Sequence, residues 1–456
     1  MLLPVLLVIS ALAYSLLRLS LIFILAHRHI VGNSVYLCYN AFMKNTLSKK
    51  ILIGVITSFF AVILAFLILC VTTMCMYSPN FLGRVLTHWD SNISDYKIFP
   101  ERIIEKSEKP YSYVKNINPD LSNVTVEYSN KQKSLSDFVS DTDSTAFIIV
   151  KNDKIIYEQY ANGYNENSIN TSFSMAKSVV SLLIGKAIEN GNIKNVAEPI
   201  SNYIPEFANK KIGQTTIEDL LLMRSEIVYD EGKFLWFGDD TLTYWYDDLR
   251  EVALSHIDLT DKYNGRFHYN NYHPLLLGLI LERSTGQSVS EFFEREIWSK
   301  IGAEYDASWS LDSKKSGFEK MESGINFHAV DFLKIGSMVL HNGYFNGTQI
   351  IDNQWLENST LCGFPLNTAE YESSFLSGKN IGYKYMWYST PSAQSEYDVI
   401  AWGKSDQILY ISPANDIVIL RTGKSDGGVS NWVEKIKEII KLVLSSVYPS
   451  SATQNE

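Results

Sequence analysis

The chain has 456 residues, of which 46% are hydrophobic and 20% charged, and its formal net charge is −10 at pH 7. That length allows one large globular domain with additional segments. No basic patch with interleaved aromatic residues occurs, which argues against nucleic acid as a partner. Cys362 is the only one of four cysteines beyond residue 76, so a disulfide framework is excluded there. No Cys-x-x-Cys, His-Glu-x-x-His or Gly-x-Ser-x-Gly sequence occurs, and we expect neither a metal ion nor a cofactor.

Two long apolar runs open the chain, at residues 2–26 and 51–76. Each is long enough to span about 30 Å of hydrocarbon as a helix. A cleaved signal peptide explains the first run poorly, because no charged segment leads into it, and would leave the second unexplained. The loop between the runs carries four basic residues and no acidic one, which favours a cytoplasmic loop. We therefore expect two transmembrane helices within 1–76 and a periplasmic or extracellular C-terminal portion. If the first run were peripheral, this orientation would be reversed.

Residues 77–140 have little periodicity, and Pro100, Pro110 and Pro119 interrupt them. Only 124–128 has the pattern of a strand. We expect this stretch to be a linker and lead-in that separates the following domain from the bilayer.

From residue 141 the pattern becomes that of a folded domain. The segment 147–158 predicts a strand hairpin, and helices with loops follow it. Three late strands and an amphipathic helix close the domain: 399–402, 408–411, 417–421 and 432–447. Strands at both ends with helices between them predict an α/β (α+β) domain over 141–448, with an antiparallel sheet flanked by helices. Residues 449–456 form a short tail.

The tetrapeptide 174–177 lies where a polar loop becomes an apolar helix. Residues three apart share one face of a helix, so the Lys177 amine is expected beside the Ser174 hydroxyl. A serine hydroxyl becomes a strong nucleophile when a neighbouring base takes its proton. The backbone N–H groups at the start of the helix could hold a developing oxyanion. This pattern predicts acyl transfer through a serine ester.

The same Ser-x-x-Lys spacing occurs at Ser112 and Lys115. That copy lies in a polar stretch without helical periodicity, and we interpret it as chance. A Tyr-x-Asn copy at Tyr128 and Asn130 lies in the same stretch and is interpreted in the same way.

Two further elements follow the serine along the chain. Tyr269 and Asn271 stand at the head of a predicted helix, where a phenol could relay a proton and an amide could orient a substrate. Lys404, Ser405 and Asp406 precede an apolar strand. A cation and a hydroxyl at that position suit a substrate carboxylate or carbonyl.

The order Ser-x-x-Lys, Tyr-x-Asn and Lys-Ser-Asp resembles the three motifs of the penicillin-recognising serine hydrolases. The Tyr-x-Asn element places the resemblance in the class C β-lactamase-like branch, which also holds esterases, D-aminopeptidases and 6-aminohexanoate-dimer hydrolases. The resemblance covers most of residues 140–445, and Ser225 followed by Tyr229 leans towards the 6-aminohexanoate-dimer hydrolases. It implies a β-lactamase/transpeptidase-like fold, with a helical subdomain and the site in the groove beside it.

The resemblance implies roles for the first two motifs. Ser174 would be the nucleophile, Lys177 its activator and Tyr269 the proton relay to the leaving group. Asn271 would position the substrate or the lysine.

The third motif departs from the family pattern. Lys404 and Ser405 would bind the acid or carbonyl of the substrate, and the N–H groups of Ser174 and Gln407 would form the oxyanion hole. The family usually has a small residue, commonly glycine, where Asp406 stands. A carboxylate beside the substrate makes a neutral ester or amide a better substrate than an anionic β-lactam or peptide.

Two functions from different classes follow from these residues. The first is a membrane-anchored serine hydrolase that cleaves an ester or amide through a Ser174 acyl-enzyme. The alternative is a non-catalytic sensor or cell-wall-binding protein on the same fold. Esters, oligoamides, D-amino-acid peptides and β-lactams all remain open as substrates, and the residues do not decide the oligomeric state. Aromatic residues at 236–237 and 244–246 are either core or the wall of a substrate groove.

Overall fold

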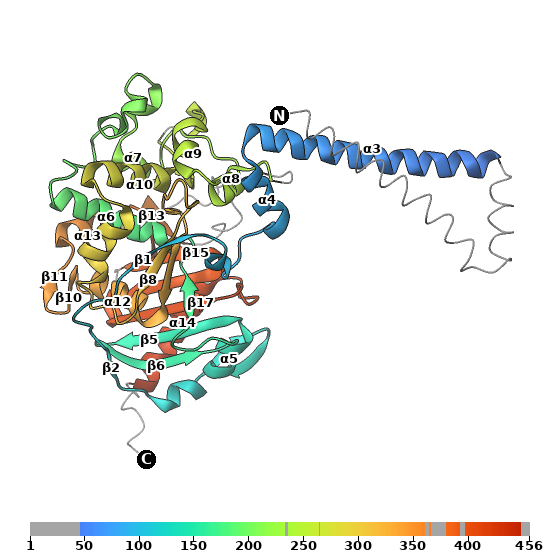
Figure 1. The fold of residues 1–456 in the computed structure, drawn as a ribbon. Coiled ribbons are helices and arrows are strands. Elements are labelled where there is room, and N and C mark those ends of the chain that lie inside the picture. The colour runs from blue at the N-terminus through green and yellow to red at the C-terminus, as the bar shows by residue number, and fades with distance from the viewer. Residues whose placement is uncertain are drawn as a thin grey trace, which may run out of the picture. The chain divides into compact units, whose positions relative to one another are not determined.

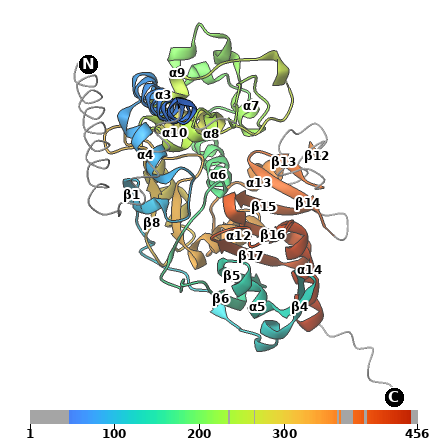
Figure 2. The same ribbon diagram turned by 90° about the vertical axis from the view of Figure 1, so that its right-hand side faces the viewer.

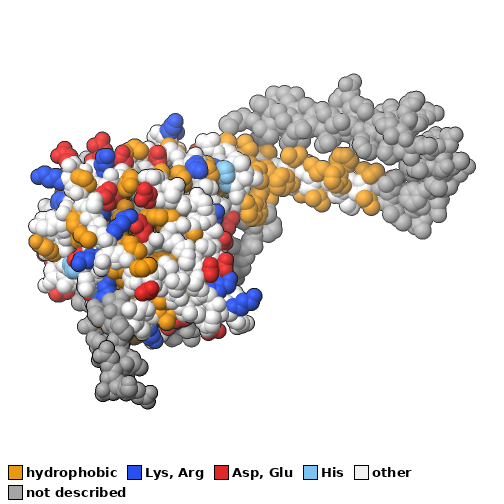
Figure 3. Space-filling model, turned by 90° about the horizontal axis from the view of Figure 1, so that it is seen from below, with side chains coloured by type: hydrophobic (Ala, Val, Ile, Leu, Met, Phe, Trp, Pro, Cys, Tyr) orange, Lys and Arg blue, Asp and Glu red, His pale blue; other side chains and the backbone are white. Residues whose placement is uncertain are grey.

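A computed structural model describes residues 46–232, 236–263, 265–360, 364–365, 380–392 and 397–447. The chain divides into two compact units, Met1–Pro79 and Asn80–Glu456. In the first unit, helix α3 (Thr46–Met76) carries exposed hydrophobic side chains along its described length (Figure 3). Its segment Ile53–Met76 is long and apolar enough to cross a membrane, and no other described helix meets that test. The apolar run 2–26 lies outside the described residues, so the expected pair of membrane helices is supported for its second member alone.

The second unit is built on a nine-stranded sheet with the order β12-β13-β14-β15-β16-β17-β5-β6-β2 (Figure 1). Neighbouring strands are antiparallel except β2 and β6, which run parallel. The strands in chain order are β2 (Val114–Lys115), β5 (Ser144–Lys151), β6 (Lys154–Tyr160), β12 (Phe364–Pro365), β13 (Gly382–Lys384), β14 (Trp387–Pro391), β15 (Tyr397–Gly403), β16 (Gln407–Ser412) and β17 (Ile417–Gly423).

Helices cover both faces of this sheet. Strand β17 is buried along its whole length, as expected for a central strand with protein on either side. Its Val418 packs so closely on Gly336 of α12 that a Cβ there would lie 2.5 Å away. Arg421 of the same strand lies 4.4 Å from the ring centroid of Trp432 on α14. Because successive side chains of a strand point to opposite faces, α12 and α14 lie on opposite sides of the sheet.

A second sheet of four strands has the order β1-β8-β9-β7 and is antiparallel throughout. Its strands are β1 (Glu101–Ile104), β7 (Ile169–Thr171), β8 (Ala307–Ser310) and β9 (Ile325–His328). Two hairpins complete the described strands: β3 (Thr125–Tyr128) with β4 (Lys131–Ser134), and β10 (Tyr344–Phe345) with β11 (Thr348–Gln349).

Figures 1 and 2 show α7, α9 and α10 gathered at one end of this unit, and β5, β6 and α5 at the other. The α-helices of the unit are α4 (Pro79–His88), α5 (Leu135–Asp141), α6 (Met175–Glu189), α7 (Ile217–Leu221), α8 (Asp239–Trp245), α9 (Leu249–Ser255), α10 (Tyr272–Thr285), α11 (Val289–Phe293), α12 (Ala329–Leu340), α13 (Asn353–Thr360) and α14 (Trp432–Val447).

The predicted antiparallel sheet with flanking helices is therefore present, and the smaller sheet was not predicted. The stretch expected to be a linker forms α4, β1 to β4 and α5, and from Asn80 onward it belongs to the same compact unit as the rest of the chain. Strand β1 pairs with β8 in full register, from Glu101 opposite Ser310 to Ile104 opposite Ala307. This pairing is long-range in the sequence, so local periodicity could not reveal it.

Candidate active site

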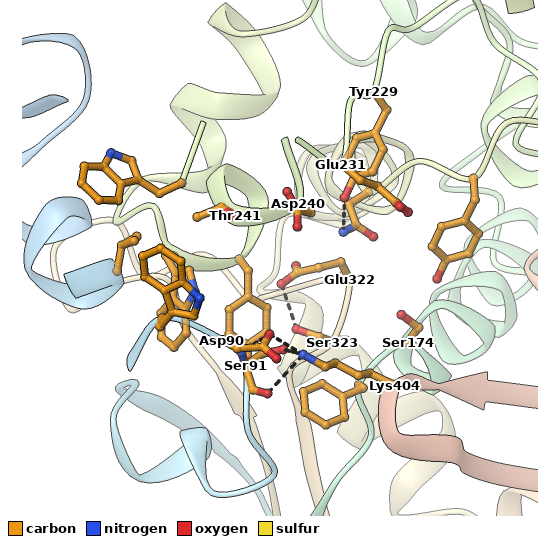
Figure 4. A pocket seen from close by; sticks show the side chains of 18 residues that line it. Asp90, Ser91, Ser174, Tyr229, Glu231, Asp240, Thr241, Glu322, Ser323 and Lys404 are labelled. Carbon is orange, nitrogen blue, oxygen red and sulfur yellow. Dashed lines mark hydrogen bonds and ion pairs between the residues drawn. The ribbon is translucent and has the colours of Figure 1, made fainter. Parts of the chain in front are cut away.

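A cavity of about 490 Å³ lies in the second unit (Figure 4). Its wall combines the start of α6, the start of α10, α8 with the loop before it, and the segment after α4. The described lining residues are Val85, Trp89, Asp90, Ser91, Phe173, Ser174, Tyr229, Glu231, Trp236, Asp240, Thr241, Tyr244, Trp245, Tyr269, Asn271, Glu322, Ser323 and Lys404. Aromatic side chains that were expected either in the core or in the wall serve both purposes, since Trp236 and Trp245 are each 2% exposed and line the cavity.

Ser174 is the N-cap residue of α6, and Lys177 stands one turn later. The Lys177 Nζ donates a hydrogen bond of 2.9 Å to the Ser174 Oγ and one of 3.0 Å to the Glu322 carbonyl oxygen. Lys177 is 2% exposed, and its Nζ lies 4.9 Å from the ring centroid of Tyr269. The amine is thus held between the hydroxyl, a carbonyl and an aromatic ring. A proton can pass directly between Ser174 and Lys177 in this geometry.

The turn that presents Ser174 is strained and closely packed. Phe173, immediately before the serine, has a φ of +42°, which is rare for a bulky residue. Gly403 at the end of β15 lies against this turn. A Cβ at that position would lie 2.5 Å from the Ser172 carbonyl oxygen and 2.9 Å from the Ser174 nitrogen. The close approach brings the beginning of the third motif next to the serine.

The second motif contributes two side chains to the cavity. Tyr269 and Asn271 both line it, and Asn271 is the N-cap residue of α10. The Asn271 Nδ2 donates to the Tyr229 hydroxyl at 2.7 Å and to the Thr243 hydroxyl at 3.3 Å. Its Oδ1 is buried and has no hydrogen-bond partner among the described residues. These two bonds hold the amide with its oxygen available to accept a hydrogen bond from a ligand.

The third motif does not place all of its residues in the cavity. Of its three residues, only Lys404 is among the described lining residues, and Gln407, the expected oxyanion donor that follows the motif, is not among them either. The Arg421 guanidinium donates hydrogen bonds to the backbone oxygens of Ser405 and Asp406, and these bonds fix the turn to β17. Both residues have positive φ, +58° for Ser405 and +52° for Asp406.

The position of Asp406 corrects an expectation. Its Oδ1 accepts a hydrogen bond of 2.8 Å from the Trp402 indole, and its carboxylate is not part of the described cavity wall. The left-handed backbone explains why the family pattern favours glycine here, and aspartate tolerates that conformation better than most residues. Asp406 therefore gives no reason to exclude anionic substrates.

Other carboxylates do line the cavity. Glu231, Asp240 and Glu322 stand on the wall across from Ser174, as Figure 4 shows. Removal of water around Asp240, followed by the nearby Glu231, raises the pKa of Asp240 to about 6, although part of the side chain remains open to the cavity. Glu322 is paired with Lys320 at 2.9 Å, and its second oxygen, Oε2, has no hydrogen-bond partner among the described residues. The cavity is thus rich in acceptors and in negative charge.

Outside the three motifs, the sequence offered only the aromatic residues at 236–237 and 244–246 as a possible wall, and the other residues of the wall were missed. Trp89, Asp90 and Ser91 come from the stretch that was expected to be a linker, Glu231 from the loop before α8, and Asp240 from the first turn of α8. No local signal marks such residues, because a single carboxylate in a loop is ordinary. The interpretation of the first decoy as chance agrees with the structure: Ser112 lies outside any helix and bonds Glu304.

Comparison with known proteins relates a large part of the chain to a family. Residues 135–354 match the family model described as Beta-lactamase. The chain is 25% identical to the 6-aminohexanoate-dimer hydrolase of Paenarthrobacter ureafaciens over 307 residues, which is 64% of this chain and 76% of that protein. It is 27% identical to the teichoic acid D-alanine hydrolase of Staphylococcus aureus (strain MRSA252) over 182 residues, or 39% of this chain and 42% of that protein.

A solved structure has the same fold. It belongs to a Bacillus anthracis protein named after 6-aminohexanoate-dimer hydrolase, with a TM-score of 0.67 and 21% identity, and the match covers 79% of this chain and 94% of the other. The expected β-lactamase/transpeptidase-like fold and the expected kinship with hydrolases are therefore confirmed. Residues 135–354 thus match the β-lactamase family, and the chain is a homologue of the 6-aminohexanoate-dimer hydrolase of Paenarthrobacter ureafaciens.

Proposed function

We propose that this protein is a membrane-anchored serine hydrolase that cleaves a linear ester or amide through an acyl-enzyme on Ser174. The observation that carries the proposal is the 2.9 Å hydrogen bond between the Lys177 amine and the Ser174 hydroxyl in the wall of a cavity. Membership of a family of serine hydrolases that act on amides or esters supports it.

Acylation would begin when Ser174 Oγ attacks the carbonyl carbon of the substrate and passes its proton to Lys177 Nζ. The negative charge that develops on the carbonyl oxygen would be stabilised by the N–H groups of Ser174 and Gln407. The bond to the leaving group then breaks, and the Tyr269 hydroxyl delivers a proton to the departing oxygen or nitrogen. Tyr269 recovers its proton from Lys177, whose Nζ lies 4.9 Å from the ring centroid.

Deacylation would follow the same path with water as the nucleophile. The water oxygen attacks the acyl carbon, Lys177 or Tyr269 takes its proton, and Ser174 Oγ is protonated as the ester breaks. The products are a carboxylic acid and the free enzyme. Asn271 would hold the substrate through its buried Oδ1, which accepts a donor such as an amide N–H.

The lining of the cavity supports a substrate with a cationic or hydrogen-bond-donating acyl group. Glu231 and Asp240 place negative charge across from Ser174, and Glu322 and Asn271 each have an acceptor oxygen without a partner among the described residues. The two named relatives are a 6-aminohexanoate-dimer hydrolase and a teichoic acid D-alanine hydrolase. An amino group is common to both acyl groups. We extend that shared chemistry to this chain as an ammonium-bearing acyl donor.

The membrane anchor rests on α3. Its segment Ile53–Met76 has the length and hydropathy of a membrane span, and most of its side chains are exposed. The basic loop before it favours a cytoplasmic N-terminal side, which would place the hydrolase unit in the periplasm or outside the cell.

The test is covalent labelling of the full chain, purified in detergent, with a fluorophosphonate probe. We expect labelling of the wild type and of Ser112→Ala, and none of Ser174→Ala. Folding of each variant is checked by circular dichroism. A folded wild-type protein that neither reacts with the probe nor hydrolyses p-nitrophenyl hexanoate would contradict the proposal and favour the non-catalytic alternative.

A further inference from the structure

The ammonium group of Lys404, the cation of the third motif, is already paired with a carboxylate of the same chain. Its Nζ forms an ion pair with the Asp90 carboxylate and donates to the Ser91 hydroxyl at 2.8 Å (Figure 4). Lys404 comes from the turn after β15, whereas Asp90 and Ser91 come from the segment after α4, and 314 residues separate the two partners of the ion pair. Among the described residues that line the cavity, Lys404 is the one cation and Asp90 one of four acids.

The segment that carries Asp90 is fixed to the hydrolase unit on both sides. Before it, Val85 of α4 is 1% exposed and Arg84 donates to the Trp245 carbonyl oxygen at 3.0 Å. After it, the Asp95 carboxylate accepts a hydrogen bond of 2.9 Å from the Tyr244 hydroxyl. The segment that carries Asp90 is therefore packed against the rest of the second unit at both of its ends.

We propose that Asp90 determines the charge selectivity of the site by standing where a substrate carboxylate would bind Lys404. The inference rests on the proposed hydrolase function and deepens it. An acyl donor with a carboxylate must displace Asp90 or share one ammonium with it, while Glu231 and Asp240 repel the donor from the opposite wall. A neutral or cationic donor meets neither obstacle.

The expected size of the effect of Asp90 on charge selectivity follows from the solvent exposure of the ion pair. The side chains of Lys404 and Asp90 are 42% and 76% exposed, so the ion pair contributes little to stability and does not block the site sterically. Its consequence is electrostatic: without Asp90, the Lys404 ammonium loses its carboxylate partner and keeps only its hydrogen bonds to Ser91. We expect discrimination of about tenfold between anionic and neutral donors to depend on Asp90, an amount that salt reduces.

The first experiment compares two p-nitrophenyl esters of matched length on the full chain in detergent, the neutral hexanoyl ester and the anionic adipoyl monoester. Asp90→Asn should raise the ratio of kcat/KM for the anionic over the neutral ester about tenfold. Asp90→Glu, which keeps the charge, should retain the wild-type ratio. Glu108→Gln, which removes an exposed charge outside the cavity wall, should retain it too. The gain should vanish in Asp90→Asn/Lys404→Gln and shrink in 0.5 M NaCl. An Asp90→Asn ratio equal to that of the wild type overturns the inference.

The second experiment does not depend on turnover and separates this inference from the proposed function. In the Ser174→Ala background, binding of hexanoate and of hexanamide is measured by calorimetry with and without Asp90→Asn. Hexanoate should bind about tenfold more tightly to the double variant, and hexanamide equally to both. Equal affinity of hexanoate for the two proteins overturns the inference even if no ester is hydrolysed. Loss of hydrolysis with retained selectivity of binding overturns only the proposed function.

Discussion

Gly403 is the position at which the fold most directly constrains the nucleophile. We therefore expect Gly403→Ala to lower both the stability of the protein and its rate of hydrolysis. Gly403 has a φ of −133°, which any residue adopts, so alanine adds only a methyl group. That methyl would lie 2.5 Å from the Ser172 carbonyl oxygen, 2.9 Å from the Ser174 nitrogen and 3.1 Å from the Phe173 Cβ. Two of these three atoms belong to the backbone of the turn, so they cannot rotate away as a flexible side chain would.

The strand and the turn must therefore separate by several tenths of an ångström or more. Overpacking of this kind costs about 1–3 kcal/mol of folding free energy. Because a displacement of about 1 Å at reacting groups can reduce a rate by about a hundredfold, we expect a loss of that order in kcat/KM. Chemical denaturation measures the first effect, and hydrolysis of p-nitrophenyl hexanoate together with the rate of fluorophosphonate labelling measures the second.

Gly83→Ala provides the matched control. Gly83 lies within α4, and a Cβ there meets no atom within 4 Å. Alanine in a helix is favoured over glycine by about 0.5–1 kcal/mol, so this variant should be as stable as the wild type or slightly more stable, with an unchanged labelling rate. If Gly403→Ala labelled at the wild-type rate and unfolded at the wild-type denaturant concentration, the close approach of β15 to the serine turn would not matter as we argue.

Four further outcomes are expected. Lys177→Ala should lower the rate of labelling by about 10²- to 10⁴-fold, since the hydroxyl loses its base. Tyr229→Phe removes the acceptor that orients Asn271, a hydrogen bond of about 1 kcal/mol, and should lower kcat/KM about fivefold without unfolding the protein. Removal of water around the carboxylate, together with the charge of the adjacent Glu231, raises the pKa of Asp240 to about 6, so this carboxylate is charged above that pH and neutral below it. The ratio of kcat/KM for a 6-aminohexanoyl ester over a hexanoyl ester should therefore decrease as the pH is lowered from 8 to 5. Burial lowers the pKa of His273 to about 3, so the unfolded chain gains a proton first as the pH falls, and the free energy of unfolding should decrease below about pH 6.5.

Each of these has its own control. Lys115→Ala alters the decoy lysine and should label normally, and a similar loss in both lysine variants would contradict the role of Lys177. Tyr344→Phe, on an exposed hairpin, should leave kcat/KM unchanged. Asp240→Asn should make the ester preference independent of pH, and a preserved pH profile would assign it to another group. For His273, a free energy of unfolding that stays constant from pH 7 to 4.5 in urea titrations would refute the prediction.

The sequence by itself determined the features that depend on local geometry. The three-residue spacing of Ser174 and Lys177 places both side chains on one face of a helix wherever that helix lies, and the structure has their atoms 2.9 Å apart. The hairpin β5–β6 and the late strands β15 to β17 could likewise be predicted from the sequence, because short-range alternation and turns specify them. The family resemblance came from the order of three short motifs, each of which is local.

The tertiary structure alone decided which charges meet in the site. Asp90 and Lys404 are ordinary residues in exposed turns, and nothing near either one in the sequence predicts their contact across 314 positions. The reverse holds for Asp406, which stands inside a recognised motif and yet turns to Trp402, because a left-handed turn directs its side chain away from the cavity. Spacing along a helix or strand fixes which neighbours can react, whereas the charge that a substrate meets is the sum over segments that only the folded chain brings together.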